Sequence, residues 1–219
     1  LVEPHLQPAP GQIRNSNGPM LLACIRRACG VPIELGIARD QREALRERIT
    51  AGLQADALVL SGGVSAGVLD LVPELLAELG VQKVFHKVSV KPGKPLWFGV
   101  LDRGEPQTLV FGLPGNPVSS LVCFELFVRP ALARLAGRPF AGLAAVSARL
   151  TAEFVQRGDR DAYHPAWLAE SPDGPTVEPL RWKGSADLRA LSTANALIRF
   201  PSGDRTFGAG EQVCVYRLN

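Results

Sequence analysis

The chain has 219 residues, 46% of them hydrophobic and 21% charged, which is typical of a folded globular protein and unlike a disordered one. Its net charge is +3, and the basic side chains are interleaved with acidic ones without a basic run, so we expect no nucleic-acid partner. The longest nearly uncharged apolar stretch, residues 118–128, is interrupted by Glu125 and is too short to cross a bilayer, so we expect no membrane span.

Helix and strand signals alternate over residues 1–139. Asn17-Gly18-Pro19 is typical of a helix start, and the spacing of Asp40 and Glu43 matches a capping box. Short links between alternating elements favour an α/β fold with a mostly parallel sheet covered on both faces. In chain order we predict a helix over 17–29, a strand over 32–38, a helix over 40–52, a strand over 56–60, a helix over 70–79, a strand over 83–90, a hairpin of 96–101 with 108–111, and a helix over 115–136.

The pattern changes after Gly137-Arg138-Pro139. Helical periodicity disappears, and short alternating runs follow one another between Gly, Pro and Asp residues, with a strong turn signal at Asp173-Gly174. We therefore predict a small all-β, barrel-like domain over residues 140–219 after an α/β domain over residues 1–139. Its predicted strands are residues 145–154, 162–169, 176–180, 196–200 and 212–216.

A glycine-rich loop follows the predicted strand over 56–60. Gly62 and Gly63 would let backbone N–H groups turn toward a phosphate, and the hydroxyls of Ser61 and Ser65 would add hydrogen bonds. Asp70 would then be placed to hold a magnesium ion that bridges phosphate oxygens. The alternative is a tight turn with Asp70 as an ordinary helix cap, and the spacing alone does not separate the two.

A second loop, Lys-Pro-Gly-Lys-Pro at residues 91–95, joins two apolar strands. Its prolines restrict the backbone and its glycine permits a close approach, so Lys91 and Lys94 would point at one anion. The alternative is a solvated loop with two exposed lysines. A functional loop is favoured, because this composition is unusual for a plain connection.

A third loop, residues 112–120, leads into the long predicted helix. Asn116 as cap and Pro117 in the first turn explain a helix start without any ligand. They do not explain the preceding Pro114-Gly115 or the paired serines Ser119 and Ser120. Free N–H groups and hydroxyls at this point also suit an anion.

Three anion-competent loops without a Ser-His-Asp set favour phosphate or oxyanion handling. The net charge agrees, because residues 140–219 carry equal numbers of acidic and basic side chains and the surplus lies in the first part. None of the three histidines neighbours a candidate nucleophile, so we expect structural roles for them. The four cysteines form no C-x-x-C pair, and we expect buried free thiols in a reducing cytosol rather than a zinc site.

At these loops the sequence resembles the molybdopterin molybdenumtransferase family, the MoeA-type proteins that include the E domain of gephyrin. The second part resembles the family as well, so the likeness spans nearly the whole chain. The motifs that carry it occur in the family's order: residues 11–17 (GQIRNSN), 36–40 (GIARD), 61–65 (SGGVS) through Asp70, 91–95 (KPGKP), 112–119 (GLPGNPVS), 183–185 (KGS), 194–195 (AN), Pro201 and Gly210.

The resemblance implies a three-layer molybdopterin-binding α/β domain, like that of MogA and MoaB, followed by a small β-barrel domain. It implies insertion of molybdate into adenylylated molybdopterin with release of AMP, helped by Mg²⁺, in the cytoplasm. Bringing molybdate and a nucleotide anhydride together requires cations and N–H donors to offset their repulsion. The implied partners are these two substrates and a MogA-type adenylyltransferase, and the parent protein would be a homodimer.

The resemblance also assigns roles to residues of this chain. Asp70 and Asp40 would be the acidic pair beside the metal and the substrate phosphates. Lys91 and Lys94 would hold molybdate or the developing charge, and together with Asp70 they form the predicted catalytic set. The substrate-binding residues it implies are Asp40, Ser61, Gly62, Gly63, Ser65, Pro95, Gly115, Asn116, Ser119, Arg160, Ser185 and Ser192.

The chain departs from the family at Asn15, where the family usually has Asp. It begins with Leu-Val-Glu-Pro, without Met or a signal peptide, so we expect a C-terminal piece of a longer protein with an incomplete first strand and doubtful activity of its own. Three alternatives stay open: the related MogA/MoaB-type adenylyltransferase, a non-catalytic scaffold that keeps the pterin site, and a plain nucleotide-binding module.

Overall fold

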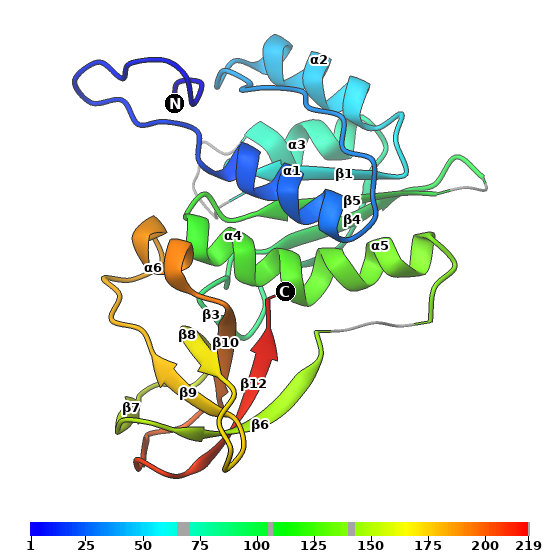
Figure 1. Ribbon diagram of the computed structural model, residues 1–219. Helices are drawn as coiled ribbons and strands as arrows, with labels where there is room; N and C mark the ends of the chain where they lie inside the picture. Colours follow the sequence, from blue (N-terminus) through cyan, green and yellow to red (C-terminus); the bar gives the residue numbers. More distant parts are fainter. Residues whose placement is uncertain (65–70, 105–106, 140–142, 219) are drawn as a thin grey trace.

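The computed structural model describes residues 1–64, 71–104, 107–139 and 143–218, with an α/β part above and a β-rich part below in Figure 1. The α/β part is built on a four-stranded sheet with the strand order β1-β5-β4-β2. Its elements are α1 (Asn17–Arg27), α2 (Arg42–Gly52), β1 (Ala57–Ser61), α3 (Leu71–Glu78), β2 (Gln82–His86), β3 (Val90–Lys91), β4 (Trp97–Leu101), β5 (Thr108–Leu113), α4 (Pro117–Cys123) and α5 (Arg129–Leu135).

The four-stranded sheet is mixed, so the expectation of a mostly parallel sheet is not confirmed in the part of the chain described. β1 runs parallel to β5, whereas β4 is antiparallel to both β5 and β2. The physical reason is the length of the links, because parallel neighbours need a crossover of a dozen or more residues. β4 and β5 are joined as the hairpin that the sequence predicted.

Helices lie on both faces of this sheet (Figure 1), and each face has its own hydrophobic core. On one face, Leu21 of α1 and Val122 of α4 pack with Phe111 of β5. On the other face, Ile49 of α2 and Leu75 of α3 pack against the opposite side of the strands. The loops that follow β1 and β5 therefore leave a sheet that is held rigidly from both sides.

The predicted strand over residues 32–38 is wrong. These residues form no strand; Val31 is 91% exposed, Ile33 is 72% exposed, and Gly36 has a φ of +72° that breaks the extended conformation. Leu35 nevertheless packs against the core beside α2. An apolar run alone does not determine a strand, because a strand also needs a neighbouring strand to pair with, and this segment has none among the described residues.

The predicted cap of α2 is also wrong. The helix begins at Arg42, its cap position is Gln41, and no side chain caps it, so Asp40 lies outside the helix.

The long predicted helix after β5 is one continuous helical segment that contains a π-helical turn, Phe124–Val128, between α4 and α5. Within that turn the carboxylate of Glu125 is fully buried and accepts hydrogen bonds from Arg27 of α1 and Arg129 of α5. A buried carboxylate is tolerable only with such partners, so this group fastens α1 to the helix.

The β-rich part contains a closed ring of strands in the order β10-β12-β6-β9-β8 and back to β10, which is the barrel that the sequence predicted. Two short strands and one helix of this part, β7, β11 and α6, were not predicted. Its elements are β6 (Ala145–Leu150), β7 (Phe154–Gln156), β8 (Asp161–Ala169), β9 (Thr176–Pro179), α6 (Leu188–Thr193), β10 (Ala196–Phe200), β11 (Arg205–Phe207) and β12 (Gln212–Arg217).

The two parts are joined through both backbone and core. The short strand β3 leaves the α/β part and pairs in parallel with the start of β8. Tyr163 of β8 and Leu197 of β10 belong to the same hydrophobic core as α4. The junction is therefore fixed, and residues that face it from both parts hold defined relative positions.

None of the described helices combines the length and the apolar character needed to span a membrane.

Candidate functional site

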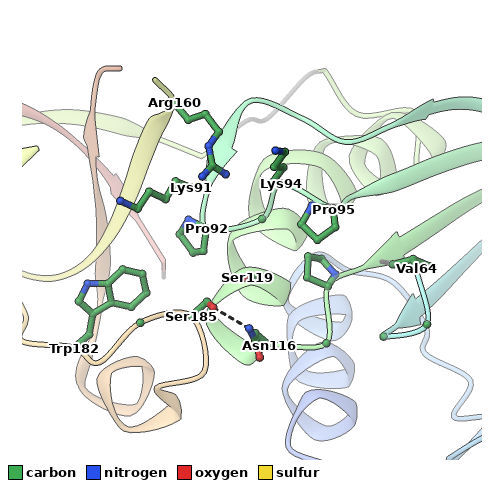
Figure 2. A pocket seen from close by; sticks show the side chains of 16 residues that line it. Val64, Lys91, Pro92, Lys94, Pro95, Asn116, Ser119, Arg160, Trp182 and Ser185 are labelled. Carbon is green, nitrogen blue, oxygen red and sulfur yellow. Dashed lines mark hydrogen bonds between the residues drawn. The ribbon is translucent and has the colours of Figure 1, made fainter. Parts of the chain in front are cut away.

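A cavity of about 590 Å³ lies at this junction, and all three predicted loops open into it (Figure 2). The α/β part contributes the ends of β1 and β5 and the loop after β3, and the barrel contributes the start of β8 and the segment before α6. The lining residues are Gly62, Gly63, Val64, Lys91, Pro92, Gly93, Lys94, Pro95, Pro114, Gly115, Asn116, Ser119, Arg160, Trp182, Gly184 and Ser185.

Gly62 and Gly63 form the first wall, where β1 ends. Both have positive φ values, +87° and +68°, which glycine adopts without strain. The N–H of Gly62 donates to the carbonyl of Leu113 at 2.9 Å, which brings this loop beside the third loop. A Cβ built on Gly62 would make an ordinary van der Waals contact, 3.9 Å long, with the Cα of Gly115, so glycine is favoured here by its positive φ rather than by lack of space.

Lys91, Lys94 and Pro95 stand on the second wall. The N–H of Val88 donates to the carbonyl of Lys94 at 2.9 Å, which closes the loop. Beneath it, the thiol of Cys123 donates to the carbonyl of Gly93 at 3.4 Å. Burial raises the pKa of Cys123 to about 12, so this group stays a neutral thiol that supports the loop.

The third wall joins the α/β part to the barrel. The side-chain amide of Asn116 donates to the hydroxyl of Ser185 at 2.8 Å, which is the dashed line in Figure 2. The N–H of Val118 donates to the carbonyl of Ser185 at 3.0 Å. Ser119 lines the cavity from the first turn of α4. Predicted residues from both parts therefore meet at this point.

Arg160 and Trp182 complete the lining from the barrel side. The Arg160 guanidinium donates to the carbonyl of Val90 at 3.2 Å, beside the second loop. Trp182 packs edge-on against His164, with ring centroids 5.3 Å apart. Burial lowers the pKa of His164 to about 4, so the ring is neutral at pH 7 and adds no charge behind the cavity.

The electrostatics of the cavity favour anions. Lys91, Lys94 and Arg160 bring three positive charges to it, and no carboxylate occurs among its described lining residues. Asp159 lies 3.7 Å from the Arg160 guanidinium, but its side chain is 95% exposed to solvent. Screening by water weakens that pair, so most of the positive charge remains available to a bound oxyanion.

Of the predicted site residues, nearly all of those that fall within the described ranges lie in this lining. The three exceptions are Ser61, Asp40, which is an exposed residue ahead of α2, and Ser192, whose hydroxyl donates to the carbonyl of Arg189. Ser61 lies directly behind the first loop and contacts Asn17 and Ser120. Ser65 and Asp70 lie outside the described residues.

The predicted magnesium site is not formed by the described residues. They contain no group of three or more His, Cys, Asp or Glu side chains that would hold a metal ion, and Asp40 is not in the cavity lining. Mg²⁺ prefers carboxylate and other oxygen ligands, so the described lining does not fit it. The metal-binding role of Asp70 stays a prediction.

The sequence interpretation missed Trp182 and the buried Asn17. Trp182 directly precedes the Lys183-Gly184-Ser185 motif. This nearness to a predicted binding serine could have identified it from the sequence. The sequence places Asn17 at a helix start and at the end of the family motif over residues 11–17, but assigns it no role in the site. No local pattern indicated that α1 would begin beneath two loops more than forty residues away in sequence.

Comparison with known proteins agrees with this architecture. Residues 5–134 match the family described as a probable molybdopterin binding domain, and residues 147–218 match the MoeA C-terminal region, domain IV. The boundary between the two matches falls close to the change of pattern after residue 139.

Relatives of similar architecture include a molybdopterin molybdenumtransferase of Synechocystis, 34% identical over 213 residues, covering 96% of this chain and 51% of the relative. A molybdopterin molybdenumtransferase of Staphylococcus epidermidis is 33% identical, covering 98% of this chain and 50% of the relative. A crystal structure of the molybdopterin biosynthesis MoeA protein from Pyrococcus horikoshii superimposes with a TM-score of 0.81 at 32% identity, covering 100% of this chain and 51% of that one.

The match over residues 5–134, together with the α/β fold of this part, places the chain in the class of proteins with a molybdopterin-binding domain. The chain belongs to the MoeA family of this class, with a molybdopterin-binding domain followed by the family's C-terminal domain. It spans about half the length of the curated relatives that it matches.

Proposed function

We propose that this chain takes part in molybdenum cofactor biosynthesis, as the part of a molybdopterin molybdenumtransferase that inserts molybdate into adenylylated molybdopterin with release of AMP. The observation that carries the proposal is the cavity at the junction of the two parts, lined by Lys91, Lys94 and Arg160 without a carboxylate among its described residues. Relatives named for this activity support it.

The proposed mechanism needs the chain to bind two anions together. Lys91 and Lys94 offset the repulsion between molybdate and the phosphoanhydride, and they stabilise the charge that develops on AMP as it leaves. Arg160 and Ser185 hold the molybdate from the barrel side. The donors at Gly115 and Asn116, with Ser119 and Pro95 beside them, orient the substrates. No side-chain nucleophile is required.

The loop of Gly62 and Gly63, backed by Ser61, binds the substrate phosphates in this proposal. Ser65, Asp70, Asp40 and Ser192 keep their predicted substrate or metal roles as hypotheses. Mg²⁺ stays a hypothesis that depends on Asp70, and no step above depends on it.

We also propose that the chain consists of two domains and that its parent protein is an oligomer. The two cores on either side of the four-stranded sheet support a three-layer α/β domain over residues 1–139, and the ring of strands supports a barrel domain over residues 140–219. We propose that the parent protein is a cytoplasmic homodimer supplied by a MogA-type adenylyltransferase.

The test is AMP release from adenylylated molybdopterin by the chain and by its full-length parent, with and without molybdate. Release that depends on molybdate supports the proposal. Formation of adenylylated pterin from ATP would indicate the adenylyltransferase instead. Binding by the parent without turnover would indicate a scaffold or a nucleotide-binding module.

A charge variant tests the site itself. Lys94→Ala should weaken the Kd for molybdate about tenfold or more, because a hydrogen bond to a charged partner is worth about 1.5–3 kcal/mol. Isothermal titration calorimetry measures the change. Lys83→Ala is the matched control, because Lys83 is an exposed lysine of β2 that does not line the cavity. Equal Kd values for the two variants would contradict the assignment.

A further inference from the structure

Asn17 is a buried polar residue that contacts two of the cavity loops from behind. Its side-chain nitrogen lies 2.7 Å from the hydroxyl of Ser61 and 2.8 Å from the carbonyl oxygen of Gly115. A third contact, 3.3 Å long, reaches the hydroxyl of Ser120. The first residue of α1 is therefore fastened to the end of β1, to the loop after β5 and to the first turn of α4.

The directions of these hydrogen bonds are fixed by two carbonyl groups. The Ser120 hydroxyl donates to the carbonyl of Pro114, and the Asn17 amide donates to the carbonyl of Gly115. A carbonyl only accepts, so rotating the Asn17 amide by half a turn would place two oxygens against each other. The side-chain nitrogen must face Gly115, and the oxygen, Oδ1, is left buried with no partner among the described residues.

An unpaired buried oxygen is unfavourable, and such groups are rare in folded proteins. Ala at this position would remove the unpaired oxygen, but it would also remove the three contacts of the side-chain nitrogen. Every contact of the Asn17 nitrogen ends on a cavity loop or on the helix behind it. Asn17 therefore holds the orientation of those loops.

The two pinned carbonyls determine where the next N–H groups point. The peptide bonds that follow Pro114 and Gly115 are trans, so each N–H points away from the preceding carbonyl. The carbonyls are held inward by Ser120 and Asn17, while Gly115 and Asn116 line the cavity. The N–H groups of Gly115 and Asn116 are thereby directed to the cavity side, and neither donates to an acceptor within the described ranges.

We propose that Asn17 is a positioning residue that holds the N–H groups of Gly115 and Asn116 as a paired donor site for an oxyanion. The inference rests on the proposed function and deepens it, because it assigns to a residue behind the cavity the orientation of the two backbone donors. The ligand chemistry is a tetrahedral oxyanion oxygen, either of molybdate or of a nucleotide phosphate.

The experiment titrates the wild-type chain and Asn17→Ala with sodium molybdate and, separately, with AMP. Calorimetry gives the Kd, and amide NMR spectra report the protons of Gly115 and Asn116. In the wild type, one of the two probes should shift both amide protons. In Asn17→Ala the Kd for that probe should weaken at least tenfold, and the two shifts should shrink.

Asn195→Ala is the matched control. Asn195 also makes two short side-chain hydrogen bonds to backbone, at 2.7 and 2.9 Å to the N–H and carbonyl of Leu168, but it does not line the cavity. It should lose stability yet keep the wild-type Kd and both amide shifts. A purely structural role for Asn17 would make the two variants alike.

The outcomes are separable. If neither molybdate nor AMP binds the wild type, the proposed function fails. If one binds but leaves the amide protons of Gly115 and Asn116 unmoved in the wild type, the paired donor site is refuted, whether or not the variant folds. If Asn17→Ala, or the milder Asn17→Ser, binds and shifts like the wild type, the positioning role is refuted.

Discussion

The charged residues of this site matter through their positions around one cavity. Lys91 and Lys94 flank a glycine on one tight loop, and Arg160 reaches the same cavity from the barrel and bonds to the carbonyl of Val90. The described lining residues include no cysteine or histidine. This arrangement suits the reaction that we propose, in which two negatively charged substrates are bound and oriented together.

His164 makes the stability of the chain depend on pH. Its pKa is about 4 in the folded chain, against 6.5 for an unperturbed histidine, mainly because the ring is buried. Between those values the unfolded chain binds a proton that the folded chain does not, so stability should fall as pH drops from about 6.5 to 4. The full contribution is about 3 kcal/mol.

Urea unfolding at several pH values measures this effect. His164→Gln, whose amide can still donate to the carbonyl of Leu180, should flatten the curve over that range. His5→Gln, at an exposed position, is the control and should keep the wild-type slope. An unchanged slope in His164→Gln would show that other groups cause the dependence.

How well the sequence predicts a site residue depends on how far along the chain its contact partners lie. The glycines and lysines of the three loops carry local signals, and their convergence follows from the α/β pattern. Arg160 and Ser185 were reached only through the family resemblance, because nothing local ties the barrel to the loops. Asn17 was missed because its partners are 44 to 103 residues away.

At the level of elements, the loop over residues 91–95 depends on the helix beneath it. Gly93 has a φ of +123°, and a Cβ there would lie 2.7 Å from the sulfur of Cys123. Gly93→Ala should therefore cost about 3 kcal/mol, from backbone strain and overpacking together. It should also weaken molybdate binding, because Lys91 and Lys94 would move with the loop.

Gly104→Ala separates these two causes. Gly104 also has a positive φ, +95°, but a Cβ there would meet open space, so only the backbone cost of about 1–2 kcal/mol applies. Thermal unfolding and molybdate titration of both variants make the comparison. If Gly93→Ala binds molybdate as well as Gly104→Ala does, the loop does not position the lysines.

Helices and strands were predicted correctly where the hydrophobic periodicity and the Gly, Pro or Asn residues at their ends indicated the same element. The helices after residues 17 and 117, the hairpin of β4 and β5, and the barrel strands fall where expected. The segment over 32–38 was wrong because an apolar run does not reveal whether a neighbouring strand exists. The strands β7 and β11 are three residues each, too short to show alternation, and α6 was hidden within a predicted connection.

For the molecule as a whole, the cavity exists because the two parts share a core and a strand pairing. β3 joins β8, and the helix after β5 packs on Tyr163 and Leu197 of the barrel. The sequence predicted two domains, and only the family resemblance, through Arg160 and Ser185, indicated that they meet at the site. That relative placement depends on many weak contacts between distant segments, and it is what turns three separate loops into one site.

The most direct test is diffraction from crystals of the chain soaked in sodium molybdate, with data collected at the molybdenum absorption edge. An anomalous peak should appear inside the cavity, within hydrogen-bonding distance of at least one of Lys94, Arg160 and Ser185. A peak only on an outer surface, or no peak at a concentration where calorimetry shows binding, would contradict the assignment of this cavity as the oxyanion site.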